Sequence, residues 1–408
     1  MRPTVSILAM VAAATASWQP ARAEVPDLTA ERWKADIRYL AAAIPTVHKN
    51  AFHHTNRAEF DVRVQSLLAQ ADEASDEEMV VGIQQLIASI GDGHSFLSTG
   101  EHFRYYPFEL LDVEGEMRIV RAADPFKQLL GSRIVAIDGM PIAEARRRIR
   151  TLIPQAENPW YVLHQETGQI VRAEDLFALK ISRRLDQALF TLQKNGEPES
   201  EVMIPSFSPK EQLDWTDMSA SLLSYSHADQ SFWFGKLPGT QAVYVNFRWY
   251  ENLEQKARQL FDYIDQTGAK ALVIDLRFNG GGNFTLPQRF IIPEIRRRSR
   301  LLKPGRLFVL VGRRTFSAAM TNAIDFKREV GAVLVGEPIG ARPNGYQENG
   351  WITLPNSGLR ASLSTMQYRF WESDIDTLNP DVMVPVRWSD FRDGADPALD
   401  YVTQRLRR

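Results

Sequence analysis

Residues 270–283 read KALVIDLRFNGGGN, and this stretch is the strongest indication of the fold. Its first half is a mostly apolar run without period-two alternation, which is typical of a strand buried on both faces of a parallel sheet. Glycines 280–282 follow, and a backbone without Cβ atoms can approach a ligand closely. Their N–H groups can form an oxyanion hole or an anion nest, and a structural turn without ligand is the alternative.

The segments around this stretch alternate between strands and helices. An α/β region with a largely parallel sheet and right-handed crossovers is therefore predicted for the second half of the chain. Strands are expected at 242–247, 270–276, 306–311 and 332–335, and helices at 253–267 and 318–330.

The first half of the chain has a different pattern. Residues 27–97 carry apolar positions at helical spacing, with the first helix expected to end at Pro45. From about residue 105 to 205 short strands dominate, including a hairpin at 108–122. Residues 129–147 resemble part of a PDZ module, although any small strand-turn-helix unit gives a similar pattern. The chain is predicted to be a multidomain α+β and α/β protein.

The N-terminal residues have the pattern of a secretory signal peptide. Met1-Arg2 is followed by an apolar run at 5–18 and by an A-x-A site at 21–23. An uncleaved anchor is the alternative, but the run is shorter than the ~20 residues that span a bilayer. We therefore expect a signal peptide at 1–23, a periplasmic or secreted protein without a membrane anchor, a helical region at 24–100, a β-rich middle region at 101–228 and a catalytic core at 229–408.

Composition excludes several classes of function. The 408 residues carry a formal net charge of −2 and no cysteine, so a disulfide scaffold is excluded and a nucleic-acid-binding protein is disfavoured. The seven histidines show no H-E-x-x-H pattern, and no metal or cofactor is predicted.

Two further residues, Ser317 and His94, are candidates for catalysis. Ser317 follows an apolar strand and opens a helix, which suits either an exposed nucleophile or an ordinary N-cap. No histidine follows Ser317, so a base for it must come from upstream or be a lysine. His94 lies at a helix end, directly after a glycine-rich turn, where it can be a catalytic base or a surface or capping histidine.

Five segments in order resemble the C-terminal processing and tricorn-core serine peptidases. KALVIDLRFNGGGN is similar to their "DLR-x-N-x-GG" loop, and RRTFSAAMTNA to the segment of the nucleophile. SIGDGHSFL, GEPIGARPNGYQ and NPDVMVP are similar to their "D-x-H-T", "GE-x-T-x-G" and "PD-x-x-V" stretches. The resemblance covers most of the chain after the signal segment and implies a β-α-β spiral related to Clp protease and crotonase.

The resemblance also implies roles for individual residues. The processing branch uses a lysine about 25 residues after the serine, where this chain has Arg342, and arginine stays protonated. The tricorn-like branch uses an upstream histidine, which His94 matches, and a late glutamate, which Glu372 matches approximately. Glu348 is the second choice for that glutamate. Gly93 stands where that branch can carry a supporting serine, a role that Ser95 would have to take.

These roles predict an exported serine peptidase that acts on peptides or proteins through an acyl-enzyme. Ser317 is the expected nucleophile, His94 the base and Glu372 its orienting group, while amides of Gly281, Gly282 and Ala318 bind the oxyanion. A binding protein for a peptide or apolar ligand on the same scaffold is the main alternative. An acyl-thioester enzyme is disfavoured because coenzyme A is not expected outside the cytoplasm.

Overall fold

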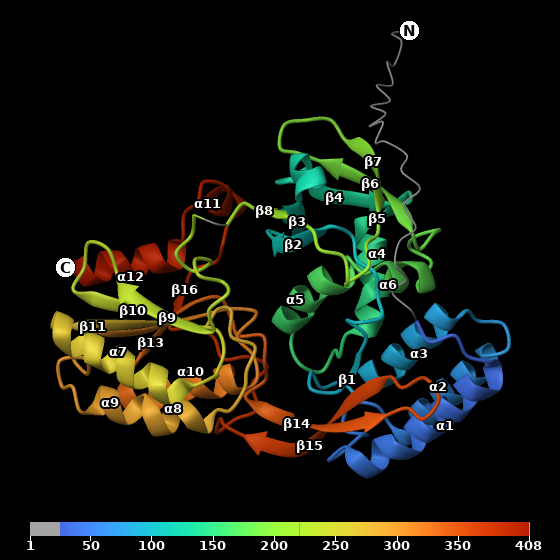
Figure 1. The fold of residues 1–408 in the computed structure, drawn as a ribbon. Helices are drawn as coiled ribbons and strands as arrows, with labels where there is room; N and C mark the ends of the chain where they lie inside the picture. The colour runs from blue at the N-terminus through green and yellow to red at the C-terminus, as the bar shows by residue number, and fades with distance from the viewer. Residues whose placement is uncertain (1–24, 220, 408) are drawn as a thin grey trace, which may run out of the picture.

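The computed structural model describes residues 25–219 and 221–407, so the predicted signal segment 1–23 lies outside the described residues. The described chain is a mixed α+β protein with three separate β-sheets, as expected in its coarse architecture (Figure 1). No helix in these two ranges is both long enough and apolar enough to cross a membrane.

Three helices form the N-terminal region, as predicted: α1 (Ala30–Val47), α2 (Arg57–Gln70) and α3 (Asp76–Ala88). The prediction that Pro45 ends the first helix is wrong, because α1 continues to Val47. A proline in the last turn removes only one hydrogen bond, which the buried face of α1 outweighs. A capping box starts α3, where Ser75 accepts from the backbone of Glu78 and the Glu78 carboxylate accepts from the Ser75 N–H.

The middle region is built on a seven-stranded sheet with the central order β2-β3-β4-β6-β7, to which β5 and β8 are attached. The strand-turn-helix unit predicted here is present, since β4 and β5 lead directly into α4. The elements are β2 (Phe108–Val113), β3 (Glu116–Ala123), β4 (Arg133–Ile137), β5 (Met140–Pro141), α4 (Ile142–Ile149), α5 (Pro159–Gln169), α6 (Ala173–Ala178), β6 (Gln187–Gln193), β7 (Ser200–Pro205) and β8 (Trp215–Asp217), with short 3-10 helices at Asp124–Leu129 and Arg150–Leu152.

The C-terminal region contains the predicted parallel sheet. Its order is β16-β13-β12-β11-β10-β9, and only β9 (Phe232–Lys236) runs antiparallel to its neighbour. The parallel strands are β10 (Ala242–Phe247), β11 (Ala271–Asp275), β12 (Leu307–Val311), β13 (Val333–Gly336) and β16 (Val382–Met383). The central strand β11 is buried along its whole length, as its sequence predicted.

Helices cover both faces of this sheet (Figure 1). On one face lie α7 (Leu253–Thr267), α8 (Thr285–Phe290), α9 (Ile292–Arg296) and α10 (Ala318–Val330). The other face packs against α12 (Pro397–Arg407), and α11 (Trp388–Arg392) precedes it. The doubly covered sheet explains why its strands read as continuous apolar runs.

A long β-hairpin connects the C-terminal region to the N-terminal region. Strands β14 (Asn344–Thr353) and β15 (Arg360–Arg369) belong to a separate three-stranded sheet and run towards α1 (Figure 1). There β15 pairs with β1 (Phe96–Ser98), which begins two residues after His94. This pairing holds the N-terminal region against the C-terminal one, and it positions the loop that carries His94.

Candidate active site

Ser317 occupies a strained turn between β12 and α10. Its backbone has φ +52° and ψ −127°, a conformation that a residue with a Cβ adopts at a cost of about 1–3 kcal/mol. Its side chain makes no capping hydrogen bond to α10, so it does not act as an ordinary N-cap. Thr315 braces the turn, since its hydroxyl donates to the Leu276 carbonyl across 2.9 Å. The turn thus presents the Ser317 hydroxyl instead of using it for the helix.

His94 meets Ser317 although the two residues are 223 positions apart. The distance from His94 Nε2 to Ser317 Oγ is 2.9 Å, a hydrogen bond of ordinary length. The ring of Phe316 stacks on the imidazole with 4.8 Å between centroids. The structure therefore brings together the two residues that the sequence singled out as nucleophile and base.

The buried His94 ring is neutral at physiological pH. Burial lowers the pKa of His94 to about 4, and the charge of Asp92 and the backbone of Tyr346 offset this only in part. Nδ1 has no side-chain partner among the described residues, and the only hydrogen bond that favours the charged ring there is that of the Tyr346 backbone. A neutral ring with its proton on Nδ1 has a free lone pair on Nε2, the arrangement that a general base for Ser317 requires.

Asp92 lies two residues before His94 and is almost fully buried. Its Oδ1 accepts from the His94 backbone N–H at 3.2 Å and from the Ser364 hydroxyl, and its Oδ2 lies 2.8 Å from His48 Nε2. Burial would raise the pKa of Asp92, but the hydrogen bonds from His48 and Ser364 outweigh it and lower the pKa. Asp92 is thus an anion fixed next to the candidate base.

Gly93 explains why the supporting serine of the tricorn-like pattern is absent. A Cβ at this position would lie 2.9 Å from Phe316 Cζ, 3.0 Å from Tyr161 Cζ and 3.1 Å from Glu157 Cγ. The buried Ser95 hydroxyl accepts the Ser364 N–H at 3.2 Å, and a hydrogen bond of this hydroxyl contributes to the lowered pKa of Asp92. Position 93 therefore favours glycine, because three side chains pack against the His94 loop and leave little space for a Cβ atom.

Glu157 links this loop to the segment that precedes the hairpin. Its carboxylate accepts the Gly93 N–H at 2.9 Å and the Arg342 N–H at 3.1 Å. Burial raises the pKa of Glu157 to about 7, although these two N–H groups act in the opposite direction. Arg342, which stands where the processing branch has its lysine, pairs with Asp376 and donates to the Ala156 carbonyl.

The glycine loop reaches the nucleophile as expected. A Cβ on Gly281 would lie 2.6 Å from Ser317 Cβ and 3.3 Å from the Ala318 nitrogen, so only glycine fits at this contact. The Gly281 N–H, however, donates to Asn279 Oδ1 across 2.9 Å, and a further bond to the Phe247 carbonyl fixes that buried amide. Ala318 is the first residue of α10, where helix geometry leaves the N–H without an intrahelical acceptor.

The two glutamates proposed as orienting groups lie elsewhere. The Glu372 side chain is 80% exposed and pairs with Arg328 at 2.6 Å. Glu348 is also exposed, and it accepts a hydrogen bond from the Tyr368 hydroxyl at 3.2 Å. The structure therefore does not bring either carboxylate to the Nδ1 of His94.

Sequence reasoning missed three buried groups around the base, namely His48, Asp92 and Glu157. Asp92 stands two residues before His94 in the "D-x-H" segment, but this spacing alone does not assign a role to the carboxylate. Nothing local in the sequence marks His48 or Glu157, because their contacts depend on the tertiary fold.

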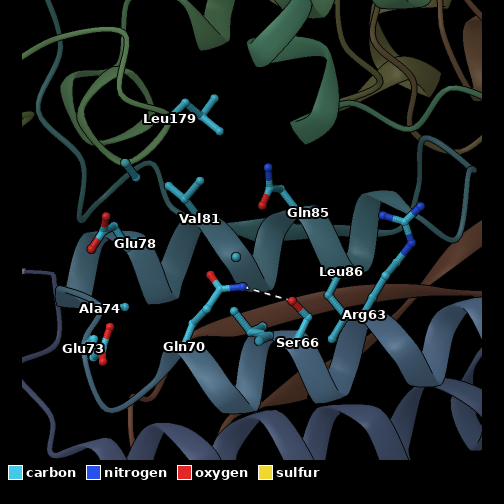
Figure 2. A pocket seen from close by; sticks show the side chains of 13 residues that line it. Arg63, Ser66, Gln70, Glu73, Ala74, Glu78, Val81, Gln85, Leu86 and Leu179 are labelled. Carbon is cyan, nitrogen blue, oxygen red and sulfur yellow. Dashed lines mark hydrogen bonds between the residues drawn. The ribbon is translucent and has the colours of Figure 1, made fainter.

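Two cavities lie near the N-terminal helices. One of about 520 Å³ borders the His94 loop and is lined by residues that include Asp92, Glu157, Arg342 and Tyr346. The other, of about 460 Å³, lies between α2, α3 and Leu179, and Figure 2 shows the Gln70 amide donating to Ser66 on its wall. The second cavity is lined by none of the residues of the candidate active site.

Comparisons with known proteins identify the fold. No family model and no curated protein matches the sequence. Mature CPAF complexed with lactacystin matches with a TM-score of 0.63 and 12% identity over 93% of this chain and 98% of that chain. A CPAF mutant matches with a TM-score of 0.64 and 11% identity over the same shares. The photosystem II D1 C-terminal processing protease also matches, with a TM-score of 0.41 and 14% identity over 90% of this chain and 98% of its own.

The matches to CPAF, over nearly the whole length of both chains, show that this chain shares the fold of that protein. Identities of this order establish shared architecture only, and activity has to be argued from the site itself.

Proposed function

We propose that this chain is an exported serine peptidase that cleaves peptide bonds through an acyl-enzyme. One observation carries the proposal: Ser317 sits in a strained strand-to-helix turn with its hydroxyl 2.9 Å from the Nε2 of a neutral, buried His94. A serine that neither caps its helix nor relaxes its backbone is arranged for reaction. The proposal of export comes from the predicted signal peptide at residues 1–23.

In the proposed reaction, His94 takes the Ser317 proton as Oγ attacks the scissile carbonyl. The imidazolium then gives this proton to the leaving amine, and water hydrolyses the acyl-enzyme by the same steps in reverse. General base catalysis of this kind contributes about 10²–10⁴-fold.

The oxyanion would be held by amides at the start of α10 and in the glycine loop. Ala318 supplies one N–H, helped by the positive end of the helix dipole. Because the Gly281 N–H is already donated to Asn279, we assign the second donor to Gly282. Each such donor is worth roughly 10²–10³-fold in rate.

In this proposal Asp92 supplies the negative charge with which the third residue of a triad stabilises the histidine. Its carboxylate holds the His94 backbone and places a negative charge near the ring, which favours the imidazolium formed during the reaction. It does this without a hydrogen bond to Nδ1, in contrast to the orienting carboxylate of a triad.

Labelling with a fluorescent fluorophosphonate tests the proposal. The wild type should be labelled, Ser317→Ala should not, and His94→Ala should be labelled at least about 10²-fold more slowly. Ser389→Ala on α11 is the control, because it removes a serine hydroxyl that belongs to none of the elements of the candidate site. A folded wild type that resists labelling while binding peptides would support the alternative of a binding protein.

That alternative rests on a specific observation. The occupied Gly281 N–H leaves one fewer donor for an oxyanion in the present arrangement. A scaffold of this fold with an incomplete oxyanion hole would bind a peptide beside Ser317 without cleaving it.

A further inference from the structure

The ring of Phe316 lies against the imidazole of the candidate base. The centroids of the Phe316 and His94 rings are 4.8 Å apart, and their planes make an angle of 26°. This is the geometry of a stacked aromatic pair. Phe316 also directly precedes Ser317, so the ring beneath the base and the candidate nucleophile come from one turn of the chain.

The Phe316 ring is itself held by a second aromatic side chain, that of Tyr161 on α5. The centroids of these two rings are 5.2 Å apart. Tyr161 is buried, and its hydroxyl donates to the Gly93 carbonyl at 3.4 Å. The residue that supports Phe316 therefore also contacts the loop that carries His94.

The backbone of Phe316 is fixed as well. Its N–H donates to the Asn279 carbonyl in the glycine loop at 3.1 Å, and its carbonyl accepts the Ala319 N–H at 3.0 Å. Its side chain packs against the apolar core of the N-terminal and middle regions and also against that of the C-terminal sheet. The position of the ring is thus determined by the glycine loop and by both cores.

His94 needs a support of this kind because no carboxylate in the described ranges binds its Nδ1. In a catalytic triad such a carboxylate holds the imidazole in the correct orientation. Here the hydrogen bond on that side of the ring is with the Tyr346 backbone. Hydrogen bonds at Nδ1 and Nε2 lie in the plane of the ring and tolerate a misalignment of about 30°. A second ring stacked on the face of the imidazole opposes that rotation.

We infer that Phe316 is a positioning residue for the reaction: its ring sets the plane of the His94 imidazole and so directs Nε2 at the Ser317 hydroxyl. The inference rests on the peptidase function proposed above and adds the means by which its base is oriented. Because the ring and the hydroxyl belong to one turn, any shift of that turn moves the support of the base together with the nucleophile. The distance from Nε2 to Oγ is thereby maintained.

Leucine at position 316 separates orientation from burial. It keeps an apolar side chain beside the imidazole but has no flat face on which the imidazole can stack. The other role open to the Phe316 ring is to exclude water, since burial is the main cause that lowers the pKa of His94 to about 4. A loss of orientation lowers the rate at every pH. A loss of burial instead raises the pKa of His94 and moves the acid limb of the pH profile.

The experiment compares the wild type with Phe316→Leu, Phe316→Met and Phe234→Leu, each as the chain after removal of residues 1–23. Methionine fills the space of the ring without its flat face and is the second variant in case leucine impairs folding. Phe234 is the matched control, because it is also partly buried on the C-terminal core and its ring lies 5.5 Å from that of a tyrosine, Tyr263. It belongs to β9, which two strands separate from β12. Fluorophosphonate labelling is followed as a function of pH, kcat and KM are measured for a peptide selected from a mixed library, and urea unfolding gives the stability.

Both variants at position 316 should be labelled about tenfold more slowly than the wild type, the scale of one aromatic contact. Their kcat should fall by the same factor with KM unchanged, and the acid midpoint should stay where the wild type has it. Phe234→Leu should lose similar stability and react like the wild type. Three results overturn the inference and leave the peptidase in place: a wild-type rate in the variants at position 316, an equal loss in Phe234→Leu, or an acid midpoint moved towards the ordinary pKa of histidine with the plateau unchanged. A wild type that neither cleaves peptides nor reacts with a fluorophosphonate overturns the proposed function, and this inference with it.

Discussion

His48 and Asp92 form a buried pair with 2.8 Å between His48 Nε2 and Asp92 Oδ2. Nδ1 of His48 accepts the Asn50 N–H at 2.9 Å, which directs Nε2 at the carboxylate. Hydrogen bonds from His48 and Ser364 lower the pKa of Asp92 and keep this buried carboxylate charged. Its negative charge acts on the His94 ring and favours a proton there.

Removing that charge should slow the reaction more than it harms the fold. Asp92→Asn is expected to reduce the rate of fluorophosphonate labelling by about 10-fold or more, since each pKa unit by which the imidazolium is disfavoured is worth 1.36 kcal/mol. Asp36→Asn is the control, because Asp36 is also buried and accepts backbone N–H bonds, from Asn356 and Ser357. Both variants should lose about 1–3 kcal/mol of stability in urea, and only Asp92→Asn should lose reactivity.

On the acid side, the labelling rate should fall to half at a pH well below the ordinary pKa of histidine. The pKa of His94 is lowered to about 4, so the neutral base persists as pH falls from 7 to 5 and becomes protonated only below that. The labelling rate should therefore reach half its plateau near pH 4, with circular dichroism confirming that the protein is folded. A midpoint near 6.5 would mean that the ring is exposed to solvent.

A side chain at position 93 should displace the base. Gly93→Ala places a methyl group within 3.1 Å of Phe316, Tyr161 and Glu157, and Phe316 also stacks on His94. We expect a loss of about 1–3 kcal/mol in stability and at least tenfold slower labelling. Gly100→Ala is the control in the same region, since nothing lies within 4 Å of its Cβ. Equal labelling of the two variants would show that the walls of the loop do not position His94.

The backbone of Ser317 should carry a measurable strain. Ser317→Gly and Ser317→Ala both remove the hydroxyl, but only glycine accepts a φ of +52° without penalty. Ser317→Gly should therefore be more stable than Ser317→Ala by about 1 kcal/mol in equilibrium unfolding. If the alanine variant is equally stable, the turn is not strained by the side chain.

The sequence predicted the parts of the fold that depend on local pattern. Helices α7 and α10 begin and end at the expected residues, and the buried strand β11 lies within the expected segment. The pair of Ser317 and His94 was also predicted, because each stands in a segment that resembles a known motif. Neither residue alone distinguishes a nucleophile or base from a capping or surface side chain.

The surroundings of His94 could not be predicted in the same way. Ser364 reaches Asp92 from 272 positions away, and that contact exists only because β15 pairs with β1. Glu372 was predicted from its approximate position before the "PD-x-x-V" motif. A position in the sequence does not determine where a side chain lies in the folded chain. The raised pKa of Glu157 likewise comes from complete burial, which local composition does not reveal.

Because β1 has to pair with β15, the candidate site can form only late in the folding of the chain. The candidate base is followed by an edge strand whose partner lies near the end of the chain, between Arg360 and Arg369. Contacts of such sequence separation are slow to form, and synthesis delivers them last. An incomplete or unfolded chain therefore has a serine but no base beside it. The topology itself delays reactivity until the whole protein has folded.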